Sequence, residues 1–238
     1  MYEIKISEGN LDRKHRDQLI RDMIYVCSIS DLSKRTRKEF LDKCISWPFS
    51  DYAENDIEKQ IKLTGCYYWS QKALDIYNDF RSKKKEKLKP KSLQSRLTHE
   101  HVVPRNVFKK AMEEYFSVLR NEMANSAYTD IENLFNQHFK ELKDMMDSRV
   151  FGCVVAKEEA IIIDGKTPGL KKEGPYKKNM PDTAYPNNIV PENDLDKFKN
   201  IIHPWARYQL VGNEITILKL RWHGADYEIV DENILERI

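Results

Sequence analysis

Apolar residues near the start of the chain recur every three or four positions, which is the spacing of an amphipathic α-helix. Within residues 11–29 this pattern places Leu19, Met23 and Cys27 on one face. We therefore predict a helix over 11–29 that buries this face against the rest of the protein.

Two more helical tracts are predicted before residue 90. The first begins at Asp31, a favourable N-cap residue, and ends before Pro48. The second covers 56–89, continues past Gly65, and ends before Pro90. The N-terminal third of the chain is therefore expected to be helical.

The pattern changes after this region. Residues 96–103 are short, rich in β-branched side chains and followed by a proline, so we predict a strand there. Two amphipathic helices are predicted next, over 105–126 and 127–148. A second strand is predicted over 149–156, and the sequence then enters a helical segment that begins KEEA.

The last third of the chain combines a long loop with short elements. Residues 165–191 hold many of the Pro and Gly residues, which predicts an ordered loop. A short helix is expected near 194–202, followed by strands over 214–220 and 225–231 that form a small C-terminal sheet.

Together these elements predict a helix-rich α+β protein. We expect an N-terminal helical region over 1–90, a central unit over 91–191 and a small C-terminal segment over 192–238, packed into one globular unit. The chain has 8 Gly and 9 Pro among 238 residues, which disfavours Gly-rich phosphate loops and many-turned β-barrels. Its 40 Lys+Arg and 38 Asp+Glu argue against a strongly cationic tail, but they leave room for a local basic face.

Cysteine spacing and hydropathy indicate the compartment. The four cysteines form no CxxC or CxxH pair and are interpreted as reduced core thiols: Cys27, Cys44, Cys66 and Cys153. The N-terminus has no apolar signal core, and no stretch approaches the roughly 18–20 apolar residues of a membrane helix. We therefore expect a cytoplasmic protein without membrane segments.

The segment Thr98-His99-Glu100-His101-Val102-Val103-Pro104 is the most informative one for chemistry. A neutral imidazole can accept a proton from a water nucleophile, and a carboxylate beside it can hold a divalent ion. Strand alternation places His99 and His101 on one face and Glu100 on the other, unless the backbone turns there. From the residues alone, a hydrogen-bonded structural cluster and a reactive site both remain open.

The run Glu100-His101-Val102-Val103-Pro104 resembles the acid–His–Val/Ile–x–Pro core of HNH (ββα-metal) nucleases. The resemblance implies that His101 is the general base and that Glu100 is a ligand of a divalent metal ion, Mg²⁺ or Mn²⁺. The strand-to-helix passage at 149–164 is similar to the second half of that core, which implies a ββα unit with a helical insertion between its strands.

The chain departs from the family pattern at its remaining metal ligands. Gly152 stands near the position of an Asn on the second strand, and Ala160 or Ile161 stands where the helix usually carries a His or Asn. Glu159 is the first choice for a replacement ligand, and Asp164 is the second.

Lysines gather on both sides of this motif, at 83–91 and 166–178. Nucleases need such cations to neutralise phosphates, although charge runs are also common as solvated faces. The DNA-contacting lysines proposed from these runs are Lys84, Lys87, Lys171 and Lys172.

The resemblance therefore implies a metal-dependent DNA endonuclease of the kind used in bacterial restriction or anti-phage defence. Double-strand cleavage with one site per chain would favour a homodimer. Two alternatives stay open: a DNA- or partner-binding module on an HNH scaffold that has lost catalysis, and an RNA-cleaving toxin of the same fold.

Overall fold

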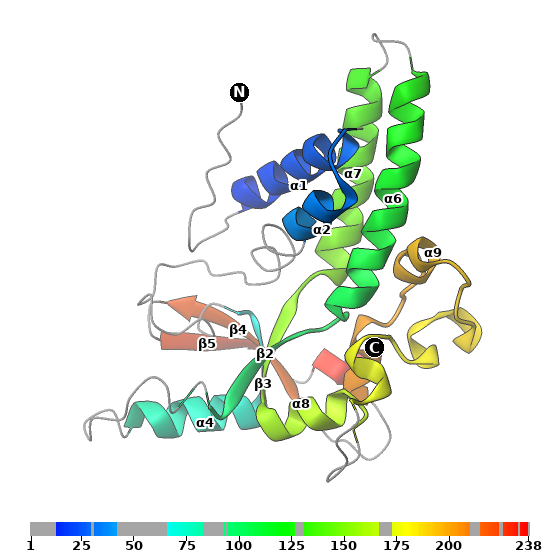
Figure 1. Cartoon of the computed structure of the whole chain (residues 1–238). Coiled ribbons are helices and arrows are strands. Elements are labelled where there is room, and N and C mark those ends of the chain that lie inside the picture. The colour runs from blue at the N-terminus through cyan, green and yellow to red at the C-terminus, as the bar shows by residue number, and fades with distance from the viewer. Residues whose placement is uncertain are drawn as a thin grey trace.

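The structure is a computed structural model, and its mixed α+β architecture confirms the predicted fold class at that level. It describes residues 13–29, 31–41, 66–82, 93, 95–126, 131–166, 173–209, 215–223, 226–232 and 234–237. A helical layer and a five-stranded sheet with its own covering helices make up these parts (Figure 1).

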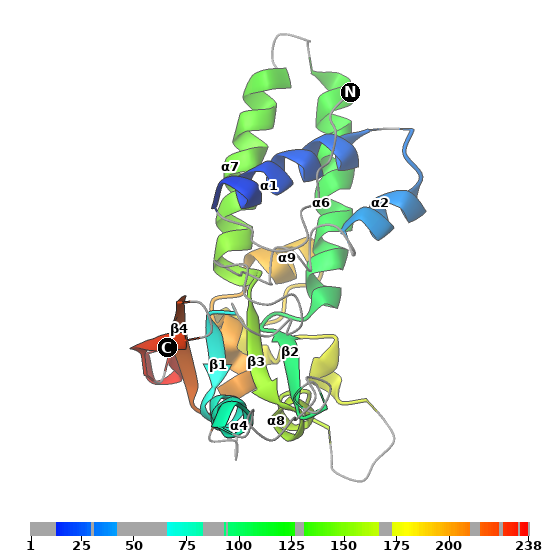
Figure 2. The ribbon, with the colours of Figure 1, turned by 90° about the vertical axis from the view of Figure 1, so that its left-hand side faces the viewer.

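A long helical hairpin dominates the upper part of the molecule (Figure 1). Shorter helices pack along it, and α1 lies across both arms of the hairpin in the view turned by 90° (Figure 2). Buried apolar side chains such as Met23, Phe116 and Met146 form the shared core of this layer. Its members are α1 (Arg13–Ser28), α2 (Lys34–Phe40), α6 (Arg105–Asn125), α7 (Ile131–Arg149) and α9 (Asp194–Lys199).

The sheet has the strand order β2-β3-β1-β4-β5. β1 runs parallel to β3, whereas the other neighbouring strands are antiparallel. The strands are β1 (Tyr68–Ser70), β2 (Leu97–His101), β3 (Gly152–Ala156), β4 (Ile217–His223) and β5 (Asp226–Asp231).

Different elements cover the two faces of the sheet. On one face, α4 (Gln71–Ser82) buries Leu74 and Tyr77 in a core that contains Val154. On the other, α8 (Lys157–Ile163) and the 3₁₀ segment η7 (Pro204–Gln209) share a core with Cys153 and Val155. The alternation along β3 therefore divides its side chains between two apolar cores.

Residues 173–188 are irregular, as predicted for the long loop. They contain three single-turn 3₁₀ segments, η4 (Pro175–Lys177), η5 (Asp182–Ala184) and η6 (Pro186–Asn188). A further 3₁₀ segment, η8 (Ile234–Arg237), lies near the C-terminus.

Two predictions about the sheet were wrong, and one predicted strand boundary was shifted. Residues 68–70, which were predicted to be helical, form β1, because their backbone pairs with both β3 and β4. The C-terminal strands do not form a separate sheet, since β1 joins β4 to β3 in one continuous sheet. The strand predicted to start at 149 begins at Gly152, because α7 continues to Arg149.

The described part of the N-terminal third does not pack as one unit. α1 contributes to the core of the helical hairpin and α2 packs against that core through Phe40, whereas β1 and α4 belong to the sheet. Within the described ranges, none of the helices combines the length and apolar character required to cross a bilayer.

The described cysteines are buried and reduced, as predicted: Cys27, Cys66 and Cys153. Cys44 lies outside the described residues.

Candidate active site

The candidate site lies on a β-β-α unit whose parts are far apart in the sequence. β2 pairs antiparallel with β3, and α8 begins at the residue that follows β3 and packs against both strands. The helical hairpin α6–α7 is the insertion between the two strands (Figure 1). This order of elements is the one that the sequence predicted for 96–164.

The histidines of the motif lie on one face of β2. The rings of His99 and His101 are 5.4 Å apart between centroids and almost perpendicular. Glu100, between them, points to the opposite face and is paired in register with Cys153. The alternation expected for a regular strand is therefore maintained through the motif, and the imidazole of His101 and the carboxylate of Glu100 lie on different faces.

Gly152 explains how β3 accommodates these rings. It is the register partner of His101, and a Cβ atom at this position would lie 2.0 Å from Nε2 of His99. The missing side chain at Gly152 leaves the space that the His99 imidazole fills.

A buried arginine faces Glu100 from the η7 segment. Nη2 of Arg207 donates a hydrogen bond to Oδ1 of Asp164 at 2.6 Å and lies 4.0 Å from Oε2 of Glu100. Its Nη1 donates to the backbone carbonyl of His101 at 2.9 Å. The Arg207 side chain is only 1% exposed, so this guanidinium holds the end of β2, the end of α8 and η7 together.

Two carboxylates therefore converge on one cation. Glu100 and Asp164 come from different elements, yet both lie beside Nη2 of Arg207. Burial raises the pKa of Glu100; the positive charge of Arg207 opposes this rise, and the charge of Asp164 adds to it. The positive charge of Lys177, a described lysine of the second run, also opposes the rise in the pKa of Glu100.

His101 is a neutral imidazole at neutral pH. Burial lowers its pKa well below the ordinary value of 6.5, and the nearby His99, Arg105 and Arg207 lower it further. A neutral ring can accept a proton, which is the property that a general base needs.

The carboxylate of Glu159 accepts hydrogen bonds from Ser70 and Ala156. Its Oε2 accepts hydrogen bonds from Oγ of Ser70 at 2.5 Å and from the backbone N–H of Ala156 at 2.8 Å. Ser70 Oγ in turn accepts from the backbone N–H of Ala73 in the first turn of α4. Glu159 thus joins the N-termini of α8 and α4, and the structure places Asp164, the second choice for the ligand, beside Glu100 instead.

The structure describes only some of the remaining predicted positions. Ala160 is buried in the apolar core and supplies no ligand. Over the described ranges, the structure contains no group of three His, Cys, Asp or Glu side chains placed to hold a metal ion. The four lysines proposed to contact DNA, Lys84, Lys87, Lys171 and Lys172, lie outside the described residues.

The sequence did not single out Arg207 as part of this site. Its neighbours Trp205 and Tyr208 are buried core residues. The only available signal was an arginine between apolar and aromatic residues in the segment HPWARYQLVG.

Comparisons with protein-family models, with curated proteins and with solved structures find no match for this chain.

Proposed function

We propose that this chain is an HNH-type endonuclease that hydrolyses DNA phosphodiester bonds with a divalent metal ion. The observation that carries the proposal is the convergence of Glu100 and Asp164 on one cation, beside the strand end that carries His101. The order of β2, β3 and α8 supports it, because a ββα unit is what the sequence motif implies.

The donor set at this position fits Mg²⁺. This ion prefers oxygen ligands and is commonly held by one or two carboxylates, with water and substrate phosphates completing its shell. Glu100 and Asp164 would hold it, and Glu159 would remain the cap of α8. When bound, the ion would stabilise the negative charge that develops on the phosphate.

His101 would act as the general base of the reaction. Its lowered pKa keeps a ring nitrogen unprotonated at neutral pH, so that it can take the proton of the attacking water. The imidazole lies on the opposite face of β2 from the Glu100 carboxylate, so the reaction would have to take place at the end of the strand, where the chain turns through Val102 to Pro104.

Positive charge near the site supports DNA as the substrate. Lys177 and Lys178 come from the second lysine run and both pair with Glu173, on the segment that packs on Asp164 through Gly174. Such cations contribute sequence-independent affinity for phosphates, which is lost at high salt. The setting that the resemblance supports is bacterial restriction or anti-phage defence in the cytoplasm, with two copies of the chain for a double-strand cut.

Cleavage of supercoiled plasmid tests the proposal. The purified protein is incubated with Mg²⁺, Mn²⁺ or EDTA, and His101→Ala is compared with His203→Ala, a histidine outside the candidate site. We expect metal-dependent cutting by the wild type and by His203→Ala, and none by His101→Ala. Equal cutting by both variants would overturn the role of His101, and cutting of RNA in place of DNA would identify the toxin alternative.

The buried Arg207 favours a second candidate function, a DNA-binding protein on an HNH scaffold without catalysis. A guanidinium that bonds Asp164 and the carbonyl of His101 already supplies the positive charge that the carboxylates need. If it stays there permanently, the protein will bind DNA and cut nothing.

Titration with Mg²⁺ in a calorimeter separates the two candidates without measuring activity. The nuclease proposal predicts that the wild type binds one Mg²⁺ per chain, and that Asp164→Asn loses this binding. The scaffold candidate predicts no Mg²⁺ binding by the wild type. Asp182→Asn, an exposed carboxylate in η5, is the matched control for the loss of one negative charge.

A further inference from the structure

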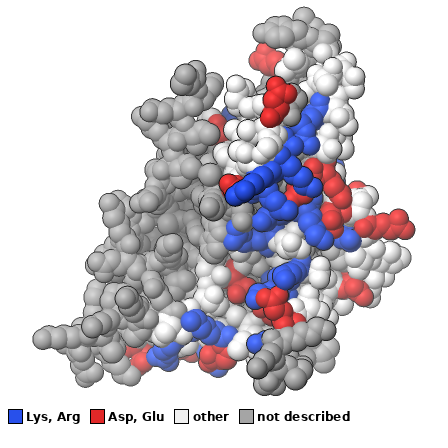
Figure 3. Space-filling view, in the orientation of Figure 1, with Lys and Arg blue, Asp and Glu red and all other residues white. Residues whose placement is uncertain are grey.

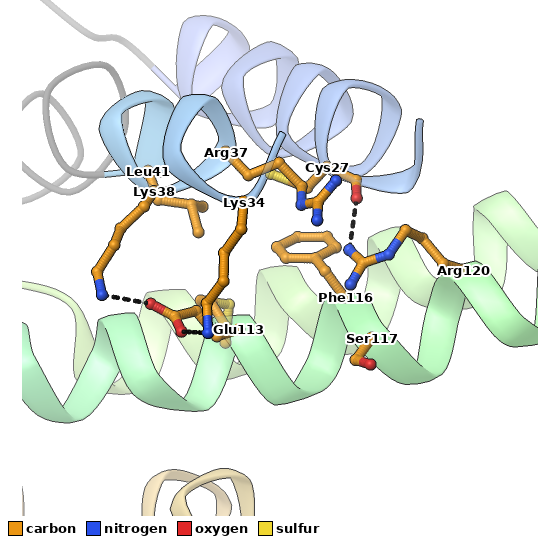
Figure 4. A pocket seen from close by; sticks show the side chains of 10 residues that line it. Cys27, Lys34, Arg37, Lys38, Leu41, Glu113, Phe116, Ser117 and Arg120 are labelled. Carbon is orange, nitrogen blue, oxygen red and sulfur yellow. Dashed lines mark hydrogen bonds and ion pairs between the residues drawn. The ribbon is translucent and has the colours of Figure 1, made fainter. Parts of the chain in front are cut away.

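A second polar site lies on the helical layer, away from the β-β-α unit. It is a cavity of about 160 Å³ between α1, α2 and α6 (Figure 4). This is about ten times the 10–15 Å³ that one water molecule requires. Its walls carry four cationic side chains and one carboxylate: Lys34, Arg37, Lys38, Arg120 and Glu113.

This cavity carries more positive than negative charge. Glu113 pairs with both lysines, at 3.5 Å from Lys34 and 3.1 Å from Lys38. Arg37 and Arg120 have no carboxylate partner among the described residues. Two guanidiniums in this partly buried cavity thus receive no counter-charge from the part of the chain that the structure describes.

Backbone carbonyls hold these two guanidiniums in place. Nη1 of Arg120 donates to the carbonyl of Cys27 at 3.0 Å, and Nη1 of Arg37 donates to the carbonyls of Leu32 and Ile29. A guanidinium has five N–H donors, so each arginine keeps donors beyond those used on the carbonyls. The two side chains point toward one another across the cavity (Figure 4).

The like charges also repel one another. Burial lowers the pKa of Arg120, and the positive charge of Arg37 lowers it further. An anion between the two side chains would turn this repulsion into attraction. The surface around the cavity continues the positive charge, because Lys and Arg side chains gather over this part of the molecule (Figure 3).

We propose that this cavity binds a phosphate group, as part of a nucleotide or of a nucleic-acid strand. Phosphate matches the arrangement because its oxygens can accept from two guanidiniums at once, in the forked geometry that arginine provides. The lysines at the rim add charge without having to move, since Glu113 already orients them. The site shares no residue with the candidate active site, so it does not depend on the proposed nuclease activity.

Binding of matched ligands tests the proposal. Adenosine monophosphate, adenosine, inorganic phosphate and a short DNA duplex are titrated into the full chain at constant ionic strength, with binding followed by calorimetry and by the melting temperature. We expect binding by at least one phosphate-bearing ligand and none by adenosine. Binding of adenosine monophosphate without the duplex would indicate a free nucleotide site, whereas binding of the duplex alone would indicate contact with a strand; inorganic phosphate measures the share of affinity that comes from the phosphate group.

Variants assign the binding to this cavity. Arg37→Gln and Arg120→Gln should each weaken binding by about tenfold or more, because each removes a charged donor. Arg35→Gln is the matched control: this residue lies on the same helix, is 88% exposed and pairs with Glu39 outside the cavity. It should bind like the wild type.

Two further measurements keep the test decisive if a glutamine variant does not fold. Arg120→Lys keeps the charge but loses the fork, so it should retain folding and show intermediate affinity. Lys34→Gln changes only an exposed rim residue and should weaken binding severalfold. The proposal is overturned if the wild type binds no phosphate-bearing ligand, or if Lys34→Gln, Arg120→Lys and Arg35→Gln all bind as the wild type does.

Discussion

The imidazole of His99 occupies the space above Gly152 that any side chain at that position would need. A Cβ atom on Gly152 would lie 2.0 Å from Nε2 and 2.4 Å from Cε1 of the ring. The two residues come from neighbouring strands, and His101 is the register partner of Gly152. A side chain at position 152 is therefore incompatible with the observed position of the His99 ring.

We expect Gly152→Ala to destabilise the protein by about 1–3 kcal/mol, because the added methyl group displaces the His99 ring from a packed position. In the His99→Ala background the ring is absent, so Gly152→Ala should lower the unfolding free energy there by much less than it does in the wild type. Urea denaturation of the wild type, both single variants and the double variant measures the coupling as a thermodynamic cycle. Strict additivity of the two single effects would contradict the steric relationship.

Arg207→Met should cost about 3–5 kcal/mol of unfolding free energy, because it leaves Glu100 and Asp164 partly buried without their cation. Arg207→Lys should cost less, since it keeps the charge but not the fork that reaches the carbonyl of His101. The control is Arg221→Met, which removes an exposed ion pair and should change the free energy by less than about 1 kcal/mol. A similar cost for the two methionine variants would show that Arg207 does not organise the site.

His101 should make the protein less stable as the pH falls below about 6.5. Its pKa is lowered in the folded protein, so in this range the unfolded chain takes up a proton that the folded protein refuses. The slope attributable to this residue is at most ~1.4 kcal/mol per pH unit and vanishes above its unfolded pKa. The raised pKa of Glu100 has the opposite effect on the unfolding free energy. The stability that this residue contributes is present below about pH 4.5 and is lost as the pH rises through its folded pKa.

Comparison with His101→Gln isolates the contribution of the histidine, since Glu100 is retained in both proteins. Unfolding free energies are measured between pH 5 and 8. The difference between wild type and variant should increase with pH up to about 6.5 and then remain level. Parallel curves across the whole range would mean that the folded protein does not exclude the proton from His101.

Glu159→Ala should lower the unfolding free energy by about 1–3 kcal/mol, because Ser70 Oγ and the N–H of Ala156 lose their buried acceptor. Glu158→Ala is the matched control: the neighbouring carboxylate is exposed and pairs with Lys72. Chemical denaturation gives the two costs, and Mg²⁺ titration of the same variants gives the affinity. A loss of Mg²⁺ affinity in Glu159→Ala without a loss of stability would restore Glu159 as the ligand.

The elements predicted from local patterns are mostly those of the structure. The helices over 105–126 and 127–148 and the strand over 96–103 are observed as α6, α7 and β2, with boundaries shifted by a few residues. These predictions succeed because the period of apolar side chains reports directly which face of an element is buried. The strand alternation of His99, Glu100 and His101 follows from the same period.

β1 shows where local patterns fail. Its three residues sit between Gly65 and a strong helix, and they become a strand because β3 and β4 lie on either side of them. No periodicity is measurable over three residues, and the pairing partners are far away in the sequence. The same is true of the sheet order, which joins the C-terminal strands to the centre of the fold through β1.

The sequence by itself determined most of the helices, the approximate positions of the two motif strands and the residues that alternate along them, because these properties depend on neighbours a few positions apart. Only the tertiary structure decided which carboxylate faces Glu100. Arg207 lies 106 positions from His101 in the sequence. It donates a hydrogen bond to Asp164 beside Glu100, whereas Glu159 accepts a hydrogen bond from Ser70 instead. Such pairings depend on the three-dimensional path of the chain. A buried charge is stabilised by a partner from any element that packs beside it, and the residues around it in the sequence do not indicate which partner that is.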